Sequence, residues 1–464
     1  MNKNNIIGFA LIAAVLIGFG IWNQPSDEQI AAQKHQDSIE NVARQNAENA
    51  AKLAAQQKIA QAKAAAEADT TALFHAALKG NATNVVLKNK DLELTINSKG
   101  GVVSKAVIKN FEDRNGNKDV TLFDSSTQSL NFALAAKNVN INTADLYFTP
   151  SNQTDSTVTM TAEAGKGKAL VINYVLGKDY MLHTQMQAVG MANDFAPSTS
   201  QMDVQWKDLV RQQERGFTFE NRYASLTYHK TDGGTDYLSE AKNLKDETIE
   251  DKIDWVAFKN QFFSAVMIAK NDFAENSQMT SIPQEKGSGY LKQYEAKMKT
   301  SFDPSGKTPS EFDFYFGPND FRLLNRVEKE CQFNKDLEMQ RLVYLGWPLF
   351  RIINRWFTIY VFDFLTGLNI NMGIVLILIT LLLKLITYPM VKKSYMSSAK
   401  MRVLKPKLEE ATKHLNKPED QMQKQQAMMA EYSKYGVSPL SGCLPMLIQM
   451  PIWIAMFNFV PNAI

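Results

Sequence analysis

The sequence predicts a multi-domain membrane protein with an all-β domain outside the cytoplasm, an α-helical transmembrane core and a cytoplasmic helical hairpin. Three observations lead to this fold class. Apolar runs that approach or reach the length of a membrane span occupy Ile6 to Trp22, Met372 to Pro389 and Cys443 to Val460. Alternating apolar and polar residues recur between the first two runs, and a basic helical stretch separates the last two. Since 464 residues exceed one ordinary core, two or three structural units are expected.

The overall composition argues against some classes of function. Lys and Arg number 51 against 48 Asp and Glu, so the net charge is only +3, although 45% of the residues are hydrophobic. No arginine-rich stripe accompanies this small charge, so we expect no nucleic acid recognition. The two cysteines, Cys331 and Cys443, fall on opposite sides of the membrane in the predicted topology. No disulfide framework is therefore expected.

Residues 1–25 are predicted to form an N-terminal signal-anchor transmembrane helix whose N-terminus is cytoplasmic. The alternative is a cleaved signal peptide, because the run from Ile6 to Trp22 is short for a span. No A-x-A cleavage site or lipobox cysteine follows Trp22, which favours a retained anchor. Residues 26–80 are rich in Ala and Gln and lack a continuous apolar stripe, so they are predicted to be a solvated spacer.

Residues 81–335 are predicted to form a β-sandwich domain. Leu92, Leu94 and Ile96 alternate with polar residues, and a Gly-Gly turn leads into a second strand from Val102 to Ile108. The segment from Tyr180 to Ala188 repeats the alternation, as expected for a half-buried antiparallel sheet. Further short strands separated by Gly, Asn, Asp and Pro extend the pattern and indicate a sandwich.

Residues 336–371 are predicted to be a linker followed by an amphipathic helix at the membrane surface. From Leu345 to Leu365, six bulky apolar residues are mixed with Arg351, Arg355 and Asp363. Such a helix places aromatic side chains in the membrane and arginines at the phosphates. The alternative is a buried helix of the β domain.

Residues 372–390 and 441–464 are predicted to be the second and third transmembrane helices, with a cytoplasmic helical hairpin at residues 391–440. The hairpin is expected to break at Asn416-Lys417-Pro418 and to end at Tyr435-Gly436. Basic residues crowd the second span on its hairpin side: Lys392, Lys393, Lys400, Arg402, Lys405 and Lys407. The positive-inside rule therefore places the hairpin in the cytoplasm, in agreement with the predicted anchor.

Sequence motifs for enzyme chemistry are absent from the chain. It contains no H-E-x-x-H, no G-x-S-x-G and no Walker lysine. The histidines, which lack ligand spacing, are interpreted as ordinary surface or core residues: His35, His75, His183, His229 and His414. We expect no catalytic residues, no metal site and no cofactor.

The polar residues of the second span are Thr380, Lys384, Thr387 and Tyr388. At 3.6 residues per turn they lie within an arc of about 100°. A charge in the membrane costs about 2.5 to 3.5 kcal/mol on insertion scales and therefore faces a partner or a wet cavity. This stripe predicts a hydrated groove. Snorkelling of Lys384 is the alternative, but it does not explain the aligned threonines and tyrosine.

The third span carries Pro445, Gln449 and Pro451, which bend a helix and free backbone groups. One face holds Met446, Gln449, Trp453 and Met456. Methionine adapts to varied apolar partners, so this face is a candidate slide for apolar segments; plain helix packing is the alternative. Asn458 points the other way and is not explained.

Four groups of residues in the C-terminal part resemble the core of the Oxa/Alb/YidC insertase family. They are Thr387-Tyr388-Pro389, the SAKMRVLKPK of 398–407, the MMAEY of 428–432 and the GCLPMLIQMPI of 442–452. Trp255-Val256-Ala257, Gln261 and Phe263 resemble the long-N-terminal Gram-negative branch. The resemblance covers essentially the whole chain.

This resemblance implies a periplasmic β-supersandwich and a five-helix core in the bacterial inner membrane. It implies a non-enzymatic insertase and chaperone that acts alone or with the Sec translocase, SecYEG and SecDF. Its partners would be nascent transmembrane segments, membrane lipids and the ribosome. Lys384, Thr380, Thr387, Tyr388 and Gln449 would form the substrate groove, with Met446, Trp453 and Met456 as the slide.

Two features depart from the family pattern. Lys384 stands where the family commonly has arginine, so the charge is kept but the planar fork is not. The chain also ends at Ile464, just after the third span, and the resemblance implies that further spans are missing. The alternative function is a membrane-anchored periplasmic carbohydrate-binding or sugar-modifying protein.

Overall fold

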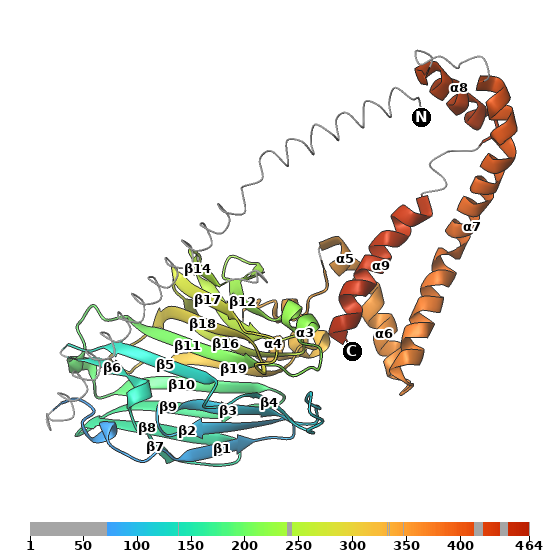
Figure 1. The fold of residues 1–464 in the computed structure, drawn as a ribbon. Helices are drawn as coiled ribbons and strands as arrows, with labels where there is room; N and C mark the ends of the chain where they lie inside the picture. The colour runs from blue at the N-terminus through green and yellow to red at the C-terminus, as the bar shows by residue number, and fades with distance from the viewer. Residues whose placement is uncertain are drawn as a thin grey trace, which may run out of the picture. The chain divides into compact units, whose positions relative to one another are not determined.

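A computed structural model describes residues 72–463 apart from 138, 239–243, 332, 334, 347, 413–420 and 437–443. The described residues divide into two compact units, 72–359 with 454–463, and 360–453 (Figure 1). The predicted anchor, most of the spacer, the helix break at 416–418 and Cys443 lie outside the described residues.

The first unit contains a small and a large antiparallel sheet. The small sheet has the order β1-β2-β3-β4, and the main path of the large one is β6-β5-β11-β18-β16-β19-β10-β9-β8-β7 (Figure 1). The strands of the small sheet are β1 Asn84–Lys88, β2 Leu92–Asn97, β3 Val102–Ile108 and β4 Val120–Phe123. The main path contains β5 Gln128–Ala135, β6 Asn140–Asn142, β7 Thr149–Ser151, β8 Thr157–Gly165, β9 Lys168–Leu176, β10 Met181–Val189, β11 Gln201–Arg211, β16 Phe263–Phe273, β18 Tyr290–Ser301 and β19 Ser310–Pro318.

Five strands pair beside this main path. They are β12 Ser225–Lys230, β13 Thr235–Tyr237, β14 Lys245–Ile249, β15 Ile253–Lys259 and β17 Ser277–Pro283. Strand β12 pairs with both β13 and β15, β15 pairs with β16, and β17 joins β14 to β18. The β-sandwich class is confirmed, and the strands lie inside the predicted 81–335 segment.

The alternating sequence pattern matches the burial of the strands. In β10, Leu182, Thr184 and Met186 are buried while Gln185 is exposed, as predicted from the period of two. Strands β2 and β3 also lie where the alternation and the Gly-Gly turn place them. Large aromatic side chains fill the core: Trp206 stacks on Phe258 with ring centroids 4.0 Å apart. The apolar faces therefore drive the packing of this unit.

Short helices complete the first unit. They are η1 Ala76–Leu78, η2 Thr143–Asp145, η3 Ala192–Asp194, α3 Phe217–Tyr223, α4 Phe321–Glu330 and η4 Met339–Leu342. Helix α4 begins at Asp320, whose carboxylate accepts a hydrogen bond from the Leu323 N–H over 2.6 Å. A helical segment then runs through α5 Pro348–Ile353, a π-helical turn Asn354–Thr358 and α6 Ile359–Thr366.

The second unit is helical. Helix α7 runs from Met372 to Thr412 without a break at Pro389 or Pro406, and α8 Gln421–Lys434 contacts it. Helix α9 extends from Leu444 to Ala463, and its residues up to 453 belong to this unit. Among the described residues one helix is long and apolar enough to cross a membrane, Met372–Glu410, with a stretch of mean hydropathy 2.4. The helical region and one apolar span are thus present.

Candidate functional site

The polar stripe of α7 contains two threonines that are hydrogen-bonded to their own helix. The Thr380 hydroxyl donates to the Leu376 carbonyl over 2.8 Å. Thr387 is buried, and its hydroxyl donates to the Leu383 carbonyl over 2.8 Å. These bonds to the preceding turn satisfy both hydroxyl protons, but each oxygen can still accept a hydrogen bond.

The other two residues of the stripe are exposed. Lys384 is exposed, and Tyr388 has 61% of its side chain accessible. No ion pair joins Lys384 to a carboxylate in the part of the chain that the structure describes. The stripe thus has a hydrogen-bonded part and an open, charged part.

Gln449 of α9 contacts this stripe. Its Nε2 donates to the Thr387 hydroxyl oxygen over 3.2 Å, which links two helices that lie far apart in the sequence. Of the predicted slide residues, Met456 is buried and Trp453 is 47% exposed, while the Met446 side chain lies outside the described residues. The joint role of these residues in substrate binding stays a prediction.

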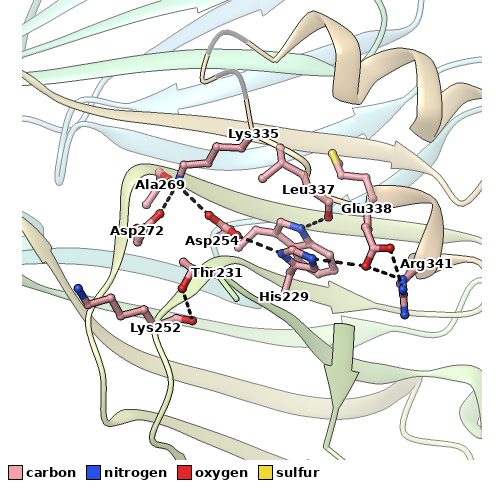
Figure 2. A network of polar contacts seen from close by, with 12 residues as sticks. His229, Thr231, Lys252, Asp254, Ala269, Asp272, Lys335, Leu337, Glu338 and Arg341 are labelled. Atoms are coloured by element: carbon pink, nitrogen blue, oxygen red, sulfur yellow. Dashed lines mark hydrogen bonds and ion pairs between the residues drawn. The ribbon is translucent and has the colours of Figure 1, made fainter. Parts of the chain in front are cut away.

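A second polar cluster, which sequence reasoning missed, lies in the β-sandwich unit (Figure 2). Lys335, in the linker after α4, donates to Asp254 over 2.8 Å, to the Ala269 carbonyl over 3.2 Å and to Asp272. The lysine thus ties the linker to strands β15 and β16. Burial alone would raise the pKa of Asp254, but hydrogen bonds from His229 and Lys335 outweigh burial and lower this pKa below its ordinary value. Burial raises the pKa of Asp272.

The cluster continues through His229 (Figure 2), and Trp255 of β15 joins it by a hydrogen bond. His229 Nδ1 lies 3.1 Å from Asp254, and its Nε2 lies 3.6 Å from Glu338. The Trp255 indole donates to the Leu337 carbonyl over 2.8 Å. Glu338 also pairs with Arg341 at 2.6 Å. His229 is therefore a core histidine, as interpreted, but it belongs to a network that fastens the linker onto the sheet.

A local signal for this network exists in the sequence. Strand β15 is buried along its whole length, yet it contains Asp254 and Lys259. Buried charges occur in strands only when they have partners, so a polar residue inside a fully apolar run indicates such a network. The partners come from distant segments and could not be named. No group of three metal-ligating side chains suited to a metal ion occurs among the described residues.

Gln261, part of the resemblance to the Gram-negative branch, has a defined contact. Its side-chain amide donates to the Pro461 carbonyl in the last turn of α9. Asn354 similarly donates to the Leu345 carbonyl over 3.0 Å and to the Ala455 carbonyl over 2.8 Å. The Pro461 carbonyl lies in the last turn of α9, where carbonyls have no backbone donor within the helix, so the Gln261 amide acts as a cap.

A large β-sandwich followed by an apolar helical region is typical of a membrane protein with a large extramembrane domain. Two family models match the chain: "YidC periplasmic domain" over residues 84–360 and "60Kd inner membrane protein" over residues 364–464. Proteins named membrane protein insertase YidC are similar over the full chain. Those of Phocaeicola vulgatus, Bacteroides fragilis and Porphyromonas gingivalis are 49%, 45% and 34% identical, and the alignments cover 74%, 74% and 75% of these relatives.

The chain belongs to the YidC family of membrane protein insertases. Its function is membrane protein insertion, and its β-sandwich is the family's periplasmic domain. The carbohydrate-binding alternative is therefore set aside.

Solved structures give only distant likenesses. The periplasmic domain of Thermotoga maritima YidC is 11% identical with a TM-score of 0.26, covering 56% of this chain and 94% of that one. A galactose mutarotase-like protein from Lactobacillus casei is 11% identical with a TM-score of 0.33, covering 51% of this chain and 100% of that one. Neither likeness carries information about function.

Proposed function

We propose that the polar stripe of α7, together with Gln449, forms a hydrated groove that receives the polar leading segment of a substrate. The observation that carries this proposal is the hydrogen bond between Gln449 and Thr387 beside the exposed Lys384. Polar side chains of two apolar helices meet there, so water and polar substrate groups find partners inside the membrane. Lys384 then attracts acidic residues of the segment that is being translocated.

The apolar part of the substrate leaves along α9 in this mechanism. Met446, Trp453 and Met456 share one face, and the exposed Trp453 ring offers an apolar surface to a passing helix. Lipid accepts that helix because its backbone is internally hydrogen-bonded. No covalent bond is made or broken, and no cofactor takes part.

The charge distribution and the family support a proposal for the topology and the partners. We infer a multi-pass protein with a cytoplasmic N-terminus, in which α8 and the basic end of α7 form a cytoplasmic hairpin. This hairpin receives nascent transmembrane segments, from a ribosome or from the Sec translocase, SecYEG and SecDF. Support comes from the lysines and arginines that follow the apolar stretch of α7, since cytoplasmic loops carry such an excess.

Site-specific photo-crosslinking tests the groove. A photoreactive residue replaces Lys384 or Gln449 in the natural gene, and a ribosome-stalled membrane protein supplies the substrate. We expect crosslinks from both positions to the leading segment, with none from Lys307, an exposed loop residue of the β-sandwich. Crosslinks from Lys307 without crosslinks from Lys384 or Gln449 would reject the groove. A proteolysis assay on intact and permeabilised cells tests the orientation of the hairpin.

A further inference from the structure

A small cavity lies between the β-sandwich and the linker that leads to α5. Its volume is about 140 Å³. Its walls come from β12, β13, β15, the linker 338–345 and the helical segment that carries Arg351 and Arg355. Pockets for drug-sized ligands measure roughly 300 to 1,000 Å³, so this one suits a single small group.

The wall formed by the linker is held in place by the polar network of Figure 2. The Trp255 indole bond to the Leu337 carbonyl and the ion pairs of Lys335 fix the backbone on one side of Glu338. On the other side, the Arg341 guanidinium pairs with the Glu338 carboxylate. Because these contacts already hold the linker against the strands, we expect little further ordering when a ligand binds.

The cavity carries an excess of positive charge. Four basic side chains line it, Lys259, Arg341, Arg351 and Arg355, against one acidic side chain, Glu338. Glu338 is already paired with Arg341. Within the described ranges no carboxylate lies within ion-pair distance of Arg351 or Arg355. An anion in the cavity would therefore relieve an uncompensated charge.

The pKa of Arg351 is consistent with this excess. Burial lowers the pKa of the Arg351 guanidinium below its ordinary value and the neighbouring Arg341 lowers it further, while Glu338 offsets only part of this effect. Guanidinium groups bind phosphate oxygens through two parallel N–H donors, and they do so more strongly when partly shielded from water. The size and donor set of the cavity thus fit one phosphate group.

A different side of the same helical segment is apolar and exposed. Leu349, Ile352 and Trp356 follow one another at spacings of three and four residues and are 59%, 58% and 71% exposed. Bulky apolar and aromatic side chains on one face with arginines on another are typical of a helix that lies in the membrane interface. This placement supplies the phosphate from a lipid headgroup. An ammonium-bearing headgroup brings a cation into a cation-rich cavity, which disfavours zwitterionic lipids.

We propose that this cavity binds the phosphate of an anionic phospholipid headgroup, held by Arg351 and Arg355, and so seats the β-sandwich domain on the membrane surface. The proposal rests on the membrane placement inferred under the proposed function. In this proposal Arg351 and Arg355 bind one headgroup in a defined site, instead of attracting the membrane surface only through their charge. The apolar residues of the segment would enter the lipid beside it.

The test uses the purified full chain in neutral detergent, titrated by calorimetry with dihexanoyl-phosphatidylglycerol, dihexanoyl-phosphatidylcholine or inorganic phosphate. We expect phosphatidylglycerol to bind at least tenfold more tightly than phosphatidylcholine, and inorganic phosphate to bind more weakly than phosphatidylglycerol. Arg351→Ala with Arg355→Ala should abolish the preference. Their replacement by Lys should keep part of it, since charge remains without the planar fork.

The matched control removes the same charge elsewhere, with Lys166→Ala and Lys307→Ala in exposed loops. It should keep the parent preference. Equal binding of the two lipids, or an equal loss of the preference in the control, would overturn the proposal. Inorganic phosphate binding as tightly as phosphatidylglycerol would assign the site to a soluble phosphate instead.

Crosslinking to the Lys384 groove is measured on the same preparations. Protein that crosslinks substrate but lacks the lipid preference rejects the headgroup site alone, and the reverse result rejects the groove alone.

Discussion

The two units treat charged residues in opposite ways. In the β-sandwich, Asp254 is buried and paired with both Lys335 and His229. In the helical unit, Lys384 lies in an apolar helix, is exposed, and has no carboxylate partner among the described residues. A buried charge with all its partners stabilises a fold, whereas an apolar helix that keeps an unpaired charge retains it for a ligand or for water. The comparison therefore assigns Asp254 to the stability of the fold and makes Lys384 the candidate residue of the proposed groove.

The largest effect is expected from reversing the charge of Lys384. Lys384→Glu should reduce insertion of substrates with acidic leading segments by more than about tenfold, because about 1.4 kcal/mol already changes a rate tenfold and the attraction becomes repulsion. Lys384→Ala should have a smaller effect and Lys384→Arg almost none. The measurement is insertion into proteoliposomes or depleted cells, with substrates that differ only in the charge of the leading segment.

The control for this series is Lys307→Glu, in an exposed loop of the β-sandwich. It should insert both classes of substrate like the parent. Equal insertion of acidic substrates by Lys384→Glu and the parent would mean that Lys384 is a snorkelling anchor, and the contrast between the units would fail.

The second effect concerns stability instead of insertion. Lys335→Ala leaves Asp254 and Asp272 close together without their cation, which should lower the free energy of unfolding by about 3 kcal/mol. The exposed pair of Lys270 and Glu311 provides the control, since Lys270→Ala should cost less than about 1 kcal/mol. Denaturant unfolding in detergent measures both. An equal loss in the two variants would show that the network is an ordinary surface pair.

The fold and the site differ in how much of each the sequence reveals. The alternation in β2, β3 and β10 was predictable because the strand period of two involves only near neighbours in the chain. The insertion of β16 between β18 and β19 was not, since pairing between distant strands leaves no local mark. The stripe on α7 was predictable because its four residues share one helix. Its contact with Gln449 depends on how two helices meet, which the periodicity of one helix does not specify.

The polar network shows the same limit. Asp254 was detectable as a charge inside an apolar run, but Lys335 and Glu338 reach it from a linker with no periodic pattern. Trp255 was noted through the family resemblance. The structural role of Trp255, a hydrogen bond from its indole to the Leu337 carbonyl, is visible only in the folded structure.

A third effect should appear as a pH dependence. Glu220 of α3 is buried without an ion pair among the described residues, and its carboxylate accepts N–H bonds from Gln213 and Glu214, both 2.9 Å long. Burial outweighs these bonds and raises the pKa of Glu220 to about 7 from 4.5. Between pH 4.5 and about 7, Glu220 keeps its proton in the folded state but has released it in the unfolded state. Stability should therefore fall by up to about 3 kcal/mol as pH rises through this window, at about 1.4 kcal/mol per pKa unit.

Glu220→Gln should remove this loss of stability at rising pH. The variant should be less stable than the parent at low pH, because the NH2 group of glutamine faces a backbone N–H and neither can accept a hydrogen bond. Glu295→Gln serves as a control of opposite sign. Burial alone would raise the pKa of Glu295, but hydrogen bonds from Gln205 and Lys207 lower it. The contribution of Glu295 to folding stability is therefore lost as pH falls. Urea unfolding between pH 4 and 8 measures both variants. A parent curve that Glu220→Gln leaves unchanged would contradict the raised pKa.

The smallest effect is expected at Thr380, and it tests whether charge or hydration dominates the groove. The Thr380 hydroxyl proton already bonds the Leu376 carbonyl, so Thr380→Val removes a group that the helix itself satisfies. Insertion should change less than about twofold, since the lost bond is worth about 0.5 kcal/mol or less within a membrane helix. Thr387→Val should cost more, about 1 kcal/mol, because it leaves the half-buried Gln449 amide without its acceptor. Both variants are compared with Lys384→Ala using the same acidic substrates. If Thr380→Val impairs insertion as strongly as Lys384→Ala, the groove acts through its water and not through its charge.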